Sequence, residues 1–184
     1  MDESLFYQKL TAALGSKVLG REVLSGRHAV SLEPSALLEA LHLLMGDPDL
    51  AYDILMDLSG ADYSTHPEPH ALPLCVSYQL YSTKHNQRAW LKVYLPMENP
   101  EVDSLTPLFA GANWYERECW DMYGVVFKGH PYLKRLLLYE EFVGHPLRKD
   151  YPILKMQPLI PMRNAVDYEA VAIRNRQDAA GQKA

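Results

Sequence analysis

The 184 residues are 48% hydrophobic and 22% charged, the composition of one globular domain with an extension, which excludes a chain that is disordered throughout. The formal net charge of −5 is unevenly divided: residues 1–127 carry 8 basic and 17 acidic side chains, and residues 128–184 carry 10 and 6. The two parts therefore face different surroundings, and the positive second part would suit an acidic protein, a nucleic acid or phospholipid headgroups.

The first part of the chain is predicted to form two helices with a hairpin between them. Apolar side chains recur at near-helical spacing over residues 4–14, and Gly15 follows as a stop signal. The apolar-rich stretches 17–24 and 27–32 are separated by a Ser-Gly pair, which favours a hairpin turn. Residues 34–45 are rich in leucine and begin with proline, a residue suited to the first turn of a helix.

A second hairpin is predicted further along the chain, after a segment at 52–63 in which apolar residues and aspartates are mixed. Apolar and polar side chains alternate over 72–82 and again over 88–95, and a polar turn joins the two stretches. A sheet must bury its apolar face, so the helices are expected to cover it. The expected fold class is α+β: residues 1–127 form a two-layer domain in which a mixed or antiparallel sheet is covered by helices.

Residues 104–123 show an apolar stripe at spacings of three and four, which predicts a helix on which Arg117 and Asp121 are placed to pair. The pattern then changes, because glycine and proline interrupt every later run. Prolines this frequent remove backbone donors and favour extended chain. Residues 128–184 are therefore expected to form an extended, proline-rich C-terminal arm that packs on partner subunits and builds no core of its own.

Sequence motifs exclude several common chemistries. No glycine-rich loop of the dinucleotide-binding or phosphate-binding type is present, nor are the signatures of serine hydrolases or zinc peptidases. Cys75 and Cys119 are far apart in sequence, so by themselves they cannot hold a four-cysteine iron–sulfur cluster or a structural zinc ion. We expect no secretory signal at the acidic amino terminus and, because the apolar runs are short, only peripheral association with a membrane.

A dense group of charged and histidine residues lies between positions 116 and 150. Without reference to a family, its two histidines and its carboxylates could form a metal site or an acid–base pair. Each histidine, however, lies between glycine and proline, which favours a rigid turn, and charges at this density also form buried ion-pair networks at subunit joints. We therefore expect an interface or structural network, with no catalytic, cofactor-binding or metal-binding residue. The predicted members are Glu116, Arg117, Glu118, Asp121, His130, Arg135, His145, Arg148, Lys149 and Asp150.

Two stretches of this region resemble the signature of a known family. The first is Glu-Arg-Glu-Cys-Trp-Asp-Met-Tyr at 116–123, followed by His130 and by Lys-Arg-Leu-Leu at 134–137. The second is Gly-His-Pro-Leu-Arg-Lys-Asp-Tyr-Pro at 144–152. Together they resemble the thirty-kilodalton-type subunit of respiratory complex I, NADH:quinone oxidoreductase, which is usually called the C subunit in bacteria.

The resemblance implies a non-catalytic structural subunit of the peripheral arm of this proton-translocating enzyme, with no cofactor of its own. FMN, iron–sulfur clusters and quinone would be bound by partner subunits. The implied partners are the forty-nine-kilodalton-type subunit, a small cluster-bearing subunit and a ferredoxin-like subunit, which in bacteria are the D, B and I subunits. With them the chain would position the quinone-reducing module for electron transfer from NADH. The implied location is the cytoplasmic face of the bacterial inner membrane, where association with the membrane is peripheral and indirect.

Three other interpretations stay open at this point. Related chains occur as equivalent subunits of membrane-bound nickel–iron hydrogenases and of dehydrogenases that use ferredoxin or another donor. A metal-dependent hydrolase built on His130 and His145 would bind a stoichiometric metal ion. A nucleic-acid-binding module would show salt-sensitive binding, but no basic patch interleaves with the aromatic residues of the acidic part, 1–127.

Overall fold

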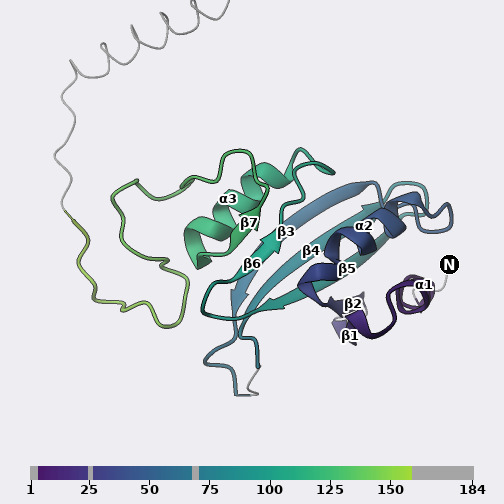
Figure 1. Cartoon of the computed structure of the whole chain (residues 1–184), viewed down its shortest axis with the longest axis horizontal. Helices are drawn as coiled ribbons and strands as arrows, with labels where there is room; N and C mark the ends of the chain where they lie inside the picture. The colour runs from purple at the N-terminus through teal and green to yellow at the C-terminus, as the bar shows by residue number, and fades with distance from the viewer. Residues whose placement is uncertain (1–3, 25–26, 68–70, 159–184) are drawn as a thin grey trace, which may run out of the picture.

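The structure is a computed structural model that describes residues 4–24, 27–67 and 71–158 (Figure 1). Its main element is a mixed five-stranded sheet with the order β1-β2-β5-β4-β3, in which β2 and β5 are parallel and the other neighbours antiparallel. A short second sheet pairs β6 with β7 in parallel. The elements are α1 (Ser4–Leu14), β1 (Val18–Leu24), β2 (Arg27–Leu32), α2 (Leu37–Gly46), β3 (Ile54–Asp62), β4 (Leu74–Ser82), β5 (Gln87–Leu95), β6 (Glu101–Asp103), α3 (Ala112–Tyr123) and β7 (Val126–Lys128), with 3-10 turns at Gly15–Lys17 and Pro34–Ala36.

Side-chain alternation along β4 divides the sheet into a buried face and a partly open face. Val76, Tyr78 and Leu80 are fully buried, whereas the alternate residues Ser77 and Gln79 are half-buried. The buried side chains belong to one hydrophobic core with the leucines of α2 and the inner side of α3. Helices form one layer and the sheet forms the other (Figure 1). This arrangement confirms the two-layer α+β class expected from the sequence.

The predicted helices at 4–14 and 34–45 and both predicted hairpins are present. The segment at 52–63, which had no clear pattern, contains β3, an edge strand of the five-stranded sheet. Leu58 is the only residue of β3 that is fully buried, so the strand has little apolar alternation to detect. The short strands β6 and β7 were not predicted at all.

The helix expected over 104–123 is wrong in its first part, because α3 begins only at Ala112. The preceding residues form a turn, in which Phe109 N–H donates to Leu105 O at 2.8 Å. Pro107 provides the reason, since the residue before a proline is disfavoured in the helical region. Leu108, the first residue of the predicted stripe, lies in this turn and is only half-buried, so the stripe placed the start of the helix too early.

Residues 129–158, called the C-terminal segment below, contain no helix or strand and form a wide loop beside α3 that leads away from the sheet (Figure 1). None of their side chains is fully buried. The remainder of the predicted arm, 159–184, lies outside the described residues. Within the ranges that the structure describes, every helix is too short or too polar to cross a membrane.

Candidate functional site

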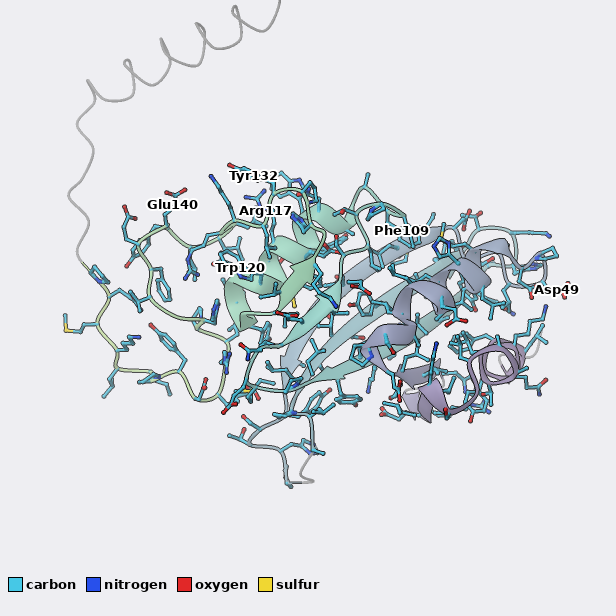
Figure 2. The ribbon with its side chains drawn as sticks, viewed as in Figure 1. Asp49, Phe109, Arg117, Trp120, Tyr132 and Glu140 are labelled. Carbon is cyan, nitrogen blue, oxygen red and sulfur yellow. The ribbon has the colours of Figure 1, made fainter. Side chains whose placement is uncertain are left out.

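The candidate site is centred on α3, which lies between β3 and the C-terminal segment (Figure 1). The helix ends at Gly124, whose φ of 77° is left-handed and whose N–H donates to Trp120 O at 2.8 Å. Two of its carboxylates, those of Glu116 and Asp121, are fully buried. Arg117 and Trp120 lie on the side of the helix that the C-terminal segment approaches (Figure 2). Charged side chains of α3 therefore lie both at buried positions and on the side that faces the C-terminal segment.

Asp121 holds the C-terminal segment to α3 through both of its carboxylate oxygens. Oδ1 accepts a hydrogen bond from Arg135 Nη1 at 2.6 Å. Oδ2 accepts the backbone N–H groups of Leu136, Leu137 and Leu138 at 2.9 to 3.0 Å. One carboxylate thus satisfies three consecutive backbone donors and one guanidinium, and the loop backbone wraps around it as an anion-binding concavity.

The environment of Asp121 keeps it ionised. Burial alone would raise the pKa of this carboxyl, but the Leu138 N–H, the Arg135 guanidinium and the two neighbouring N–H groups outweigh it and lower the pKa below its ordinary value. The stability that these bonds contribute is present above the ordinary carboxyl pKa and is lost as the pH falls through the lowered value. The attachment of the loop is therefore fully formed at neutral pH.

Arg135 connects Asp121 to the far side of the same loop. Its Nη2 donates to Phe142 O at 2.7 Å and to Gly144 O at 3.2 Å. Its guanidinium also lies 5.6 Å from the ring centroids of Trp120 and Phe142, within reach of a cation–π interaction with each. The Arg135 side chain is only 12% exposed, so it forms a buried ion pair, and its Nη2 group is also paired.

Arg117 stabilises the outer part of the loop. It donates to the backbone carbonyls of residues 134 and 135 at 3.1 and 3.0 Å. Its guanidinium lies within cation–π distance of two aromatic rings, 5.7 Å from the centroid of Trp114 and 5.6 Å from that of Tyr132. The predicted pairing of Arg117 with Asp121 is therefore wrong, because the loop supplies a different partner to each residue.

His145 occupies the C-terminal end of α3. Its Nδ1 donates to Asp121 O at 3.0 Å, since a carbonyl can only accept, and Leu147 N–H donates to Met122 O at 3.1 Å. These two carbonyls belong to the last turn and would otherwise have no helical partner. Gly124 permits the close approach, because a Cβ there would lie 2.7 Å from His145 Cδ2.

The predicted residues 148–150 attach to the ends of two strands. Lys149 N–H donates to Asp62 Oδ2 at 2.7 Å, at the end of β3. Burial would raise the pKa of Asp62, but this bond and others outweigh it and lower the pKa. Arg148 Nη2 donates to Met97 O at 3.2 Å, just beyond β5, and the same guanidinium contacts the Asp150 carboxylate at 3.3 to 3.4 Å.

Glu116 and Glu118 do not join this network. Glu116 Oε2 accepts the Ser104 hydroxyl and Oε1 accepts Leu105 N–H, both at 2.6 Å, which fixes the turn that follows β6. Burial raises the pKa of Glu116 to about 6, although the two hydrogen bonds counteract it. Glu118 is exposed and forms no hydrogen bond or ion pair with any residue that the structure describes.

The two histidines lie at opposite ends of α3. His130 Nε2 donates to Asn113 O at 3.2 Å, and its Nδ1 accepts Tyr132 N–H at 2.9 Å. His145 contacts Asp121, about 12 Å further along the helix axis at 1.5 Å per residue. Within the described residues, no three histidine, cysteine or acidic side chains are grouped so that they could hold a metal ion. The geometry therefore does not bring together the residues that the hydrolase interpretation requires.

Sequence reasoning missed the partners that lie outside positions 116–150. Asp62, Met97 and Ser104 each bind a residue of the predicted group through a backbone or hydroxyl contact. The contact between Asp62 and Lys149 spans 87 residues and uses a backbone N–H, which every residue other than proline carries. No local signal could therefore have identified it.

The comparisons with known proteins agree with one another. A family model described as respiratory-chain NADH dehydrogenase, 30 Kd subunit, matches residues 30–157. The C subunit of NADH-quinone oxidoreductase from Roseiflexus sp. is 40% identical over 153 residues, 83% of this chain and 86% of that protein. The protein of the same name from Albidiferax ferrireducens is 38% identical over 172 residues, 90% of this chain and 85% of that protein.

Two solved structures share the fold. The trypsin-resistant fragment (1-134) of Nqo5 superposes with a TM-score of 0.60 at 30% identity, covering 69% of this chain and 98% of that chain. A chain of the membrane-bound sulfane sulfur reductase, an archaeal respiratory membrane complex, superposes with a TM-score of 0.62 at 18% identity, covering 83% of this chain and 86% of that chain. At that identity the second similarity concerns the fold alone.

Proposed function

Because the chain belongs to the 30 kDa subunit family of respiratory-chain NADH dehydrogenases and is thus a subunit of NADH:quinone oxidoreductase, we propose that it is a non-catalytic structural subunit of the peripheral arm of this complex. It positions the quinone-reducing module so that electrons from NADH reach quinone and drive proton translocation. It contributes no active site of its own. FMN, the iron–sulfur clusters and quinone are bound by partner subunits.

The proposed partners are the forty-nine-kilodalton-type subunit, the small cluster-bearing subunit and the ferredoxin-like subunit. The α+β domain packs against the forty-nine-kilodalton-type subunit, and the C-terminal segment holds that subunit near the other two. The proposed location is the cytoplasmic face of the bacterial inner membrane, with peripheral attachment through the complex. The support for these partners is the presence of both signature stretches, 116–123 and 144–152, on one side of the fold.

One observation carries the structural role: the C-terminal segment presents apolar side chains that the described chain leaves uncovered. Ile153, Leu154 and Met156 are 98%, 92% and 89% exposed. Apolar surface of this kind is stabilised when a partner removes it from water. The preceding part of the segment is attached to α3 through Asp121 and to the end of β3 through Asp62, so the uncovered end follows an anchored stretch. Such anchoring reduces the entropy lost on binding.

The roles of the polar residues also favour a structural function. Arg117, Arg135, His130 and His145 all bind backbone carbonyls, so their donors serve the chain's own conformation. The equivalent subunit of a membrane-bound nickel–iron hydrogenase, or of a dehydrogenase with ferredoxin or another donor, is the less favoured alternative. The matching family and the curated relatives are subunits of NADH dehydrogenases and NADH-quinone oxidoreductases.

The test is affinity purification of the tagged chain from its native membranes in mild detergent, followed by mass spectrometry and an NADH:quinone activity assay. We expect cluster-bearing and membrane subunits to co-purify with activity. A triple variant, Ile153→Ser, Leu154→Ser and Met156→Ser, should recover at least tenfold less of these subunits. Its isolated chain should melt at the wild-type temperature, because all three side chains are exposed.

The matched control removes exposed apolar surface elsewhere. Leu19 and Val23, on the edge strand β1, are 54% and 60% exposed, so Leu19→Ser with Val23→Ser makes the same kind of change away from the C-terminal segment. Full recovery of the complex with the control and loss with the triple variant would support the proposal. Equal recovery with both would contradict the docking role, and co-purification of hydrogenase subunits would favour the alternative.

A further inference from the structure

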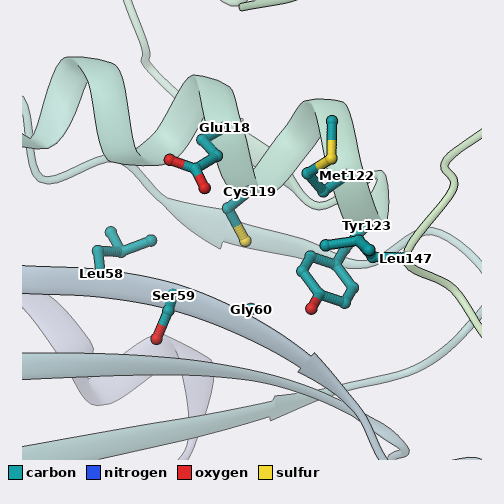
Figure 3. Close-up of a pocket in the computed structure, with 8 residues that line it drawn as sticks. All are labelled: Leu58, Ser59, Gly60, Glu118, Cys119, Met122, Tyr123 and Leu147. Atoms are coloured by element: carbon teal, nitrogen blue, oxygen red, sulfur yellow. The ribbon is translucent and has the colours of Figure 1, made fainter. Parts of the chain in front are cut away.

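A small cavity lies between α3 and β3 (Figure 3). Its volume is about 120 Å³. The residues of its wall that matter here are Leu58, Gly60, Glu118, Cys119, Tyr123 and Leu147. The inner wall is apolar, and Glu118 brings a carboxylate to it from α3 (Figure 3).

Close packing of α3 on β3 forms the inner wall of the cavity. Gly60 has no side chain, and a Cβ at this position would lie 2.5 Å from Cδ2 of Tyr123 and 3.0 Å from Sγ of Cys119. The helix therefore packs directly on the backbone of β3 at Gly60. Leu147 is held beside the cavity because its N–H donates to Met122 O at 3.1 Å. The cavity is a product of the fold and of the loop attachment together.

Glu118 differs from the other two carboxylates of the same helix. Glu116 and Asp121 are fully buried and accept hydrogen bonds from the chain itself. Glu118 is exposed, and in the part of the chain that the structure describes it has no hydrogen-bonding or ionic partner. An apolar cavity with an unpaired anion at its wall complements a side chain that has an apolar stem and a positive end.

We propose that this cavity receives the side chain of one lysine or arginine from a neighbouring subunit. The aliphatic stem packs against Leu58 and Tyr123, and the positive end pairs with the Glu118 carboxylate. The cavity of about 120 Å³ is smaller than the apolar cavity of about 150 Å³ that holds the six carbons of benzene, and it suits the three or four methylene groups of an arginine or lysine stem, with the charged end at the wall. The assignment rests on the proposed function, since it needs a neighbouring subunit to supply the residue.

The position of the cavity supports a partner as the source. Leu147 is 48% exposed at the cavity wall and continues into the C-terminal segment, whose apolar end is the proposed docking surface. The segment that carries the proposed docking surface therefore also borders the cavity. Charge complementarity between partners contributes specificity and association rate more than affinity.

The test compares charge reversal at two exposed glutamates in the affinity-purified complex. Glu118→Lys should lower the recovery of the other subunits at least tenfold, and Glu118→Gln should lower it less. Glu98→Lys is the control, because Glu98 is also exposed and lies on the bend after β5. All three isolated chains should melt at the wild-type temperature, which separates an assembly defect from misfolding.

A water-soluble carbodiimide then identifies the occupant, because it couples a carboxylate directly to a neighbouring lysine amine. In the wild-type complex, a cross-link from Glu118 to a lysine of another subunit would establish the proposal. Selective loss with Glu118→Lys but no such cross-link would assign the site to arginine, which the reagent does not couple. A cross-link to a lysine of this same chain would overturn the assignment to a partner.

Failure of this proposal is distinguishable from failure of the proposed function. If the wild-type chain recovers no other subunits, both proposals are overturned. If wild-type, Glu98→Lys and Glu118→Lys chains all recover the complex equally, only the cavity assignment is overturned.

Discussion

The sheet domain and the C-terminal segment are held in place by different kinds of interaction. In the sheet domain, the largest fully buried side chains are apolar except for Tyr78, and nearly all are leucines contributed by the helices and strands. In residues 129–158 no side chain is fully buried, and the conformation depends on hydrogen bonds to one buried carboxylate and to helix-end carbonyls. Burial stabilises the domain by itself, whereas the segment depends on polar groups that the domain supplies, chiefly Asp121, with further contacts from Arg117 and Asp62.

This difference suits the proposed function, in which the sheet domain is a rigid body and the C-terminal segment connects it to partner subunits. A segment without a core loses little when a partner reshapes its end, since few packed contacts must be broken. Its base, however, cannot move without unpairing a buried charge, which is unfavourable by several kcal/mol. The substitutions below separate these two modes of stabilisation.

The largest effect is expected from Asp121→Ala. The substitution leaves the mostly buried Arg135 guanidinium and three loop N–H groups without their acceptor, a loss of about 3 to 5 kcal/mol in local stability. Hydrogen exchange of the amides at 136–138 should accelerate by at least two orders of magnitude, as measured by mass spectrometry. The strands of the five-stranded sheet should keep most of their protection.

Asp103→Ala is the control for that experiment. Asp103 forms an ion pair with Lys128 at 3.3 Å, in which the two side chains are 36% and 54% exposed. Removal of such a surface pair changes stability by less than about 1 kcal/mol. If Asp121→Ala left exchange at 136–138 no faster than Asp103→Ala does, the polar attachment of the segment would be disproved.

Leu91→Ala should destabilise the sheet domain and leave the attachment of the C-terminal segment unchanged, the reverse of what is expected for Asp121→Ala. Leu91 is fully buried on the central strand β5, so its truncation leaves a cavity in the core and lowers the free energy of unfolding by about 2 to 5 kcal/mol. Chemical denaturation of the whole domain should shift to lower denaturant concentration. Below that transition, exchange at 136–138 should match wild type. Selective release of the loop would show that the two regions are not independently stabilised.

The sheet domain was largely predictable because its residues carry repeating signals. Apolar alternation identified β4 and β5, near-helical spacing identified α1, and leucine content with a first-turn proline identified α2. The edge strand β3 was not identified, because only Leu58 faces the core there. The start of α3 was misplaced, because a turn before Ala112 buries apolar side chains at nearly helical intervals.

The polar contacts were predictable only in part, because Glu118 has no partner among the described residues and the partners Asp62 and Ser104 lie outside the predicted group. Charge density drew attention to the right stretch of sequence, yet it implied one cluster where the structure has several separate groups. Asp121 binds three backbone N–H groups and Glu116 binds a fourth, and a backbone donor has no sequence signature. The pairing of Arg117 with Asp121 failed for the same reason, since both residues bind the loop.

Glu116 provides a pH-dependent comparison with Asp121 on the same helix. Its pKa is raised to about 6 from 4.5, so between these pH values the folded chain binds more protons than the unfolded chain. Stability should therefore fall by roughly 2 kcal/mol as the pH rises through this window, opposite in sign to the effect of Asp121 at lower pH. Glu116→Gln should remove this slope, because glutamine does not ionise.

The measurement is chemical unfolding of wild-type and Glu116→Gln chains from pH 4.5 to pH 7.5. The difference in unfolding free energy between the two chains isolates Glu116, because all other titrations are common to both. That difference should change by roughly 2 kcal/mol as the pH rises from 4.5 through about 6. A difference that stays constant with pH would mean that Glu116 titrates normally and that its burial carries no penalty.

The smallest effect is expected at Asp150. Its side chain is 61% exposed and lies 3.3 to 3.4 Å from the Arg148 guanidinium, so Asp150→Asn should change the free energy of unfolding by less than about 1 kcal/mol.

Arg148→Ala should have a larger effect on local hydrogen exchange at 148–150, because the Arg148 guanidinium also donates to Met97 O. It should also weaken assembly while leaving the chemistry of the other subunits intact, since Arg148 positions the stretch before Ile153. Hydrogen exchange and recovery of the complex measure the two effects separately. Asp121 is buried and Asp150 is exposed, so the two substitutions should differ in effect. If Asp150→Asn disturbed the segment as strongly as Asp121→Ala, burial of the carboxylate would not determine how strongly it holds the segment.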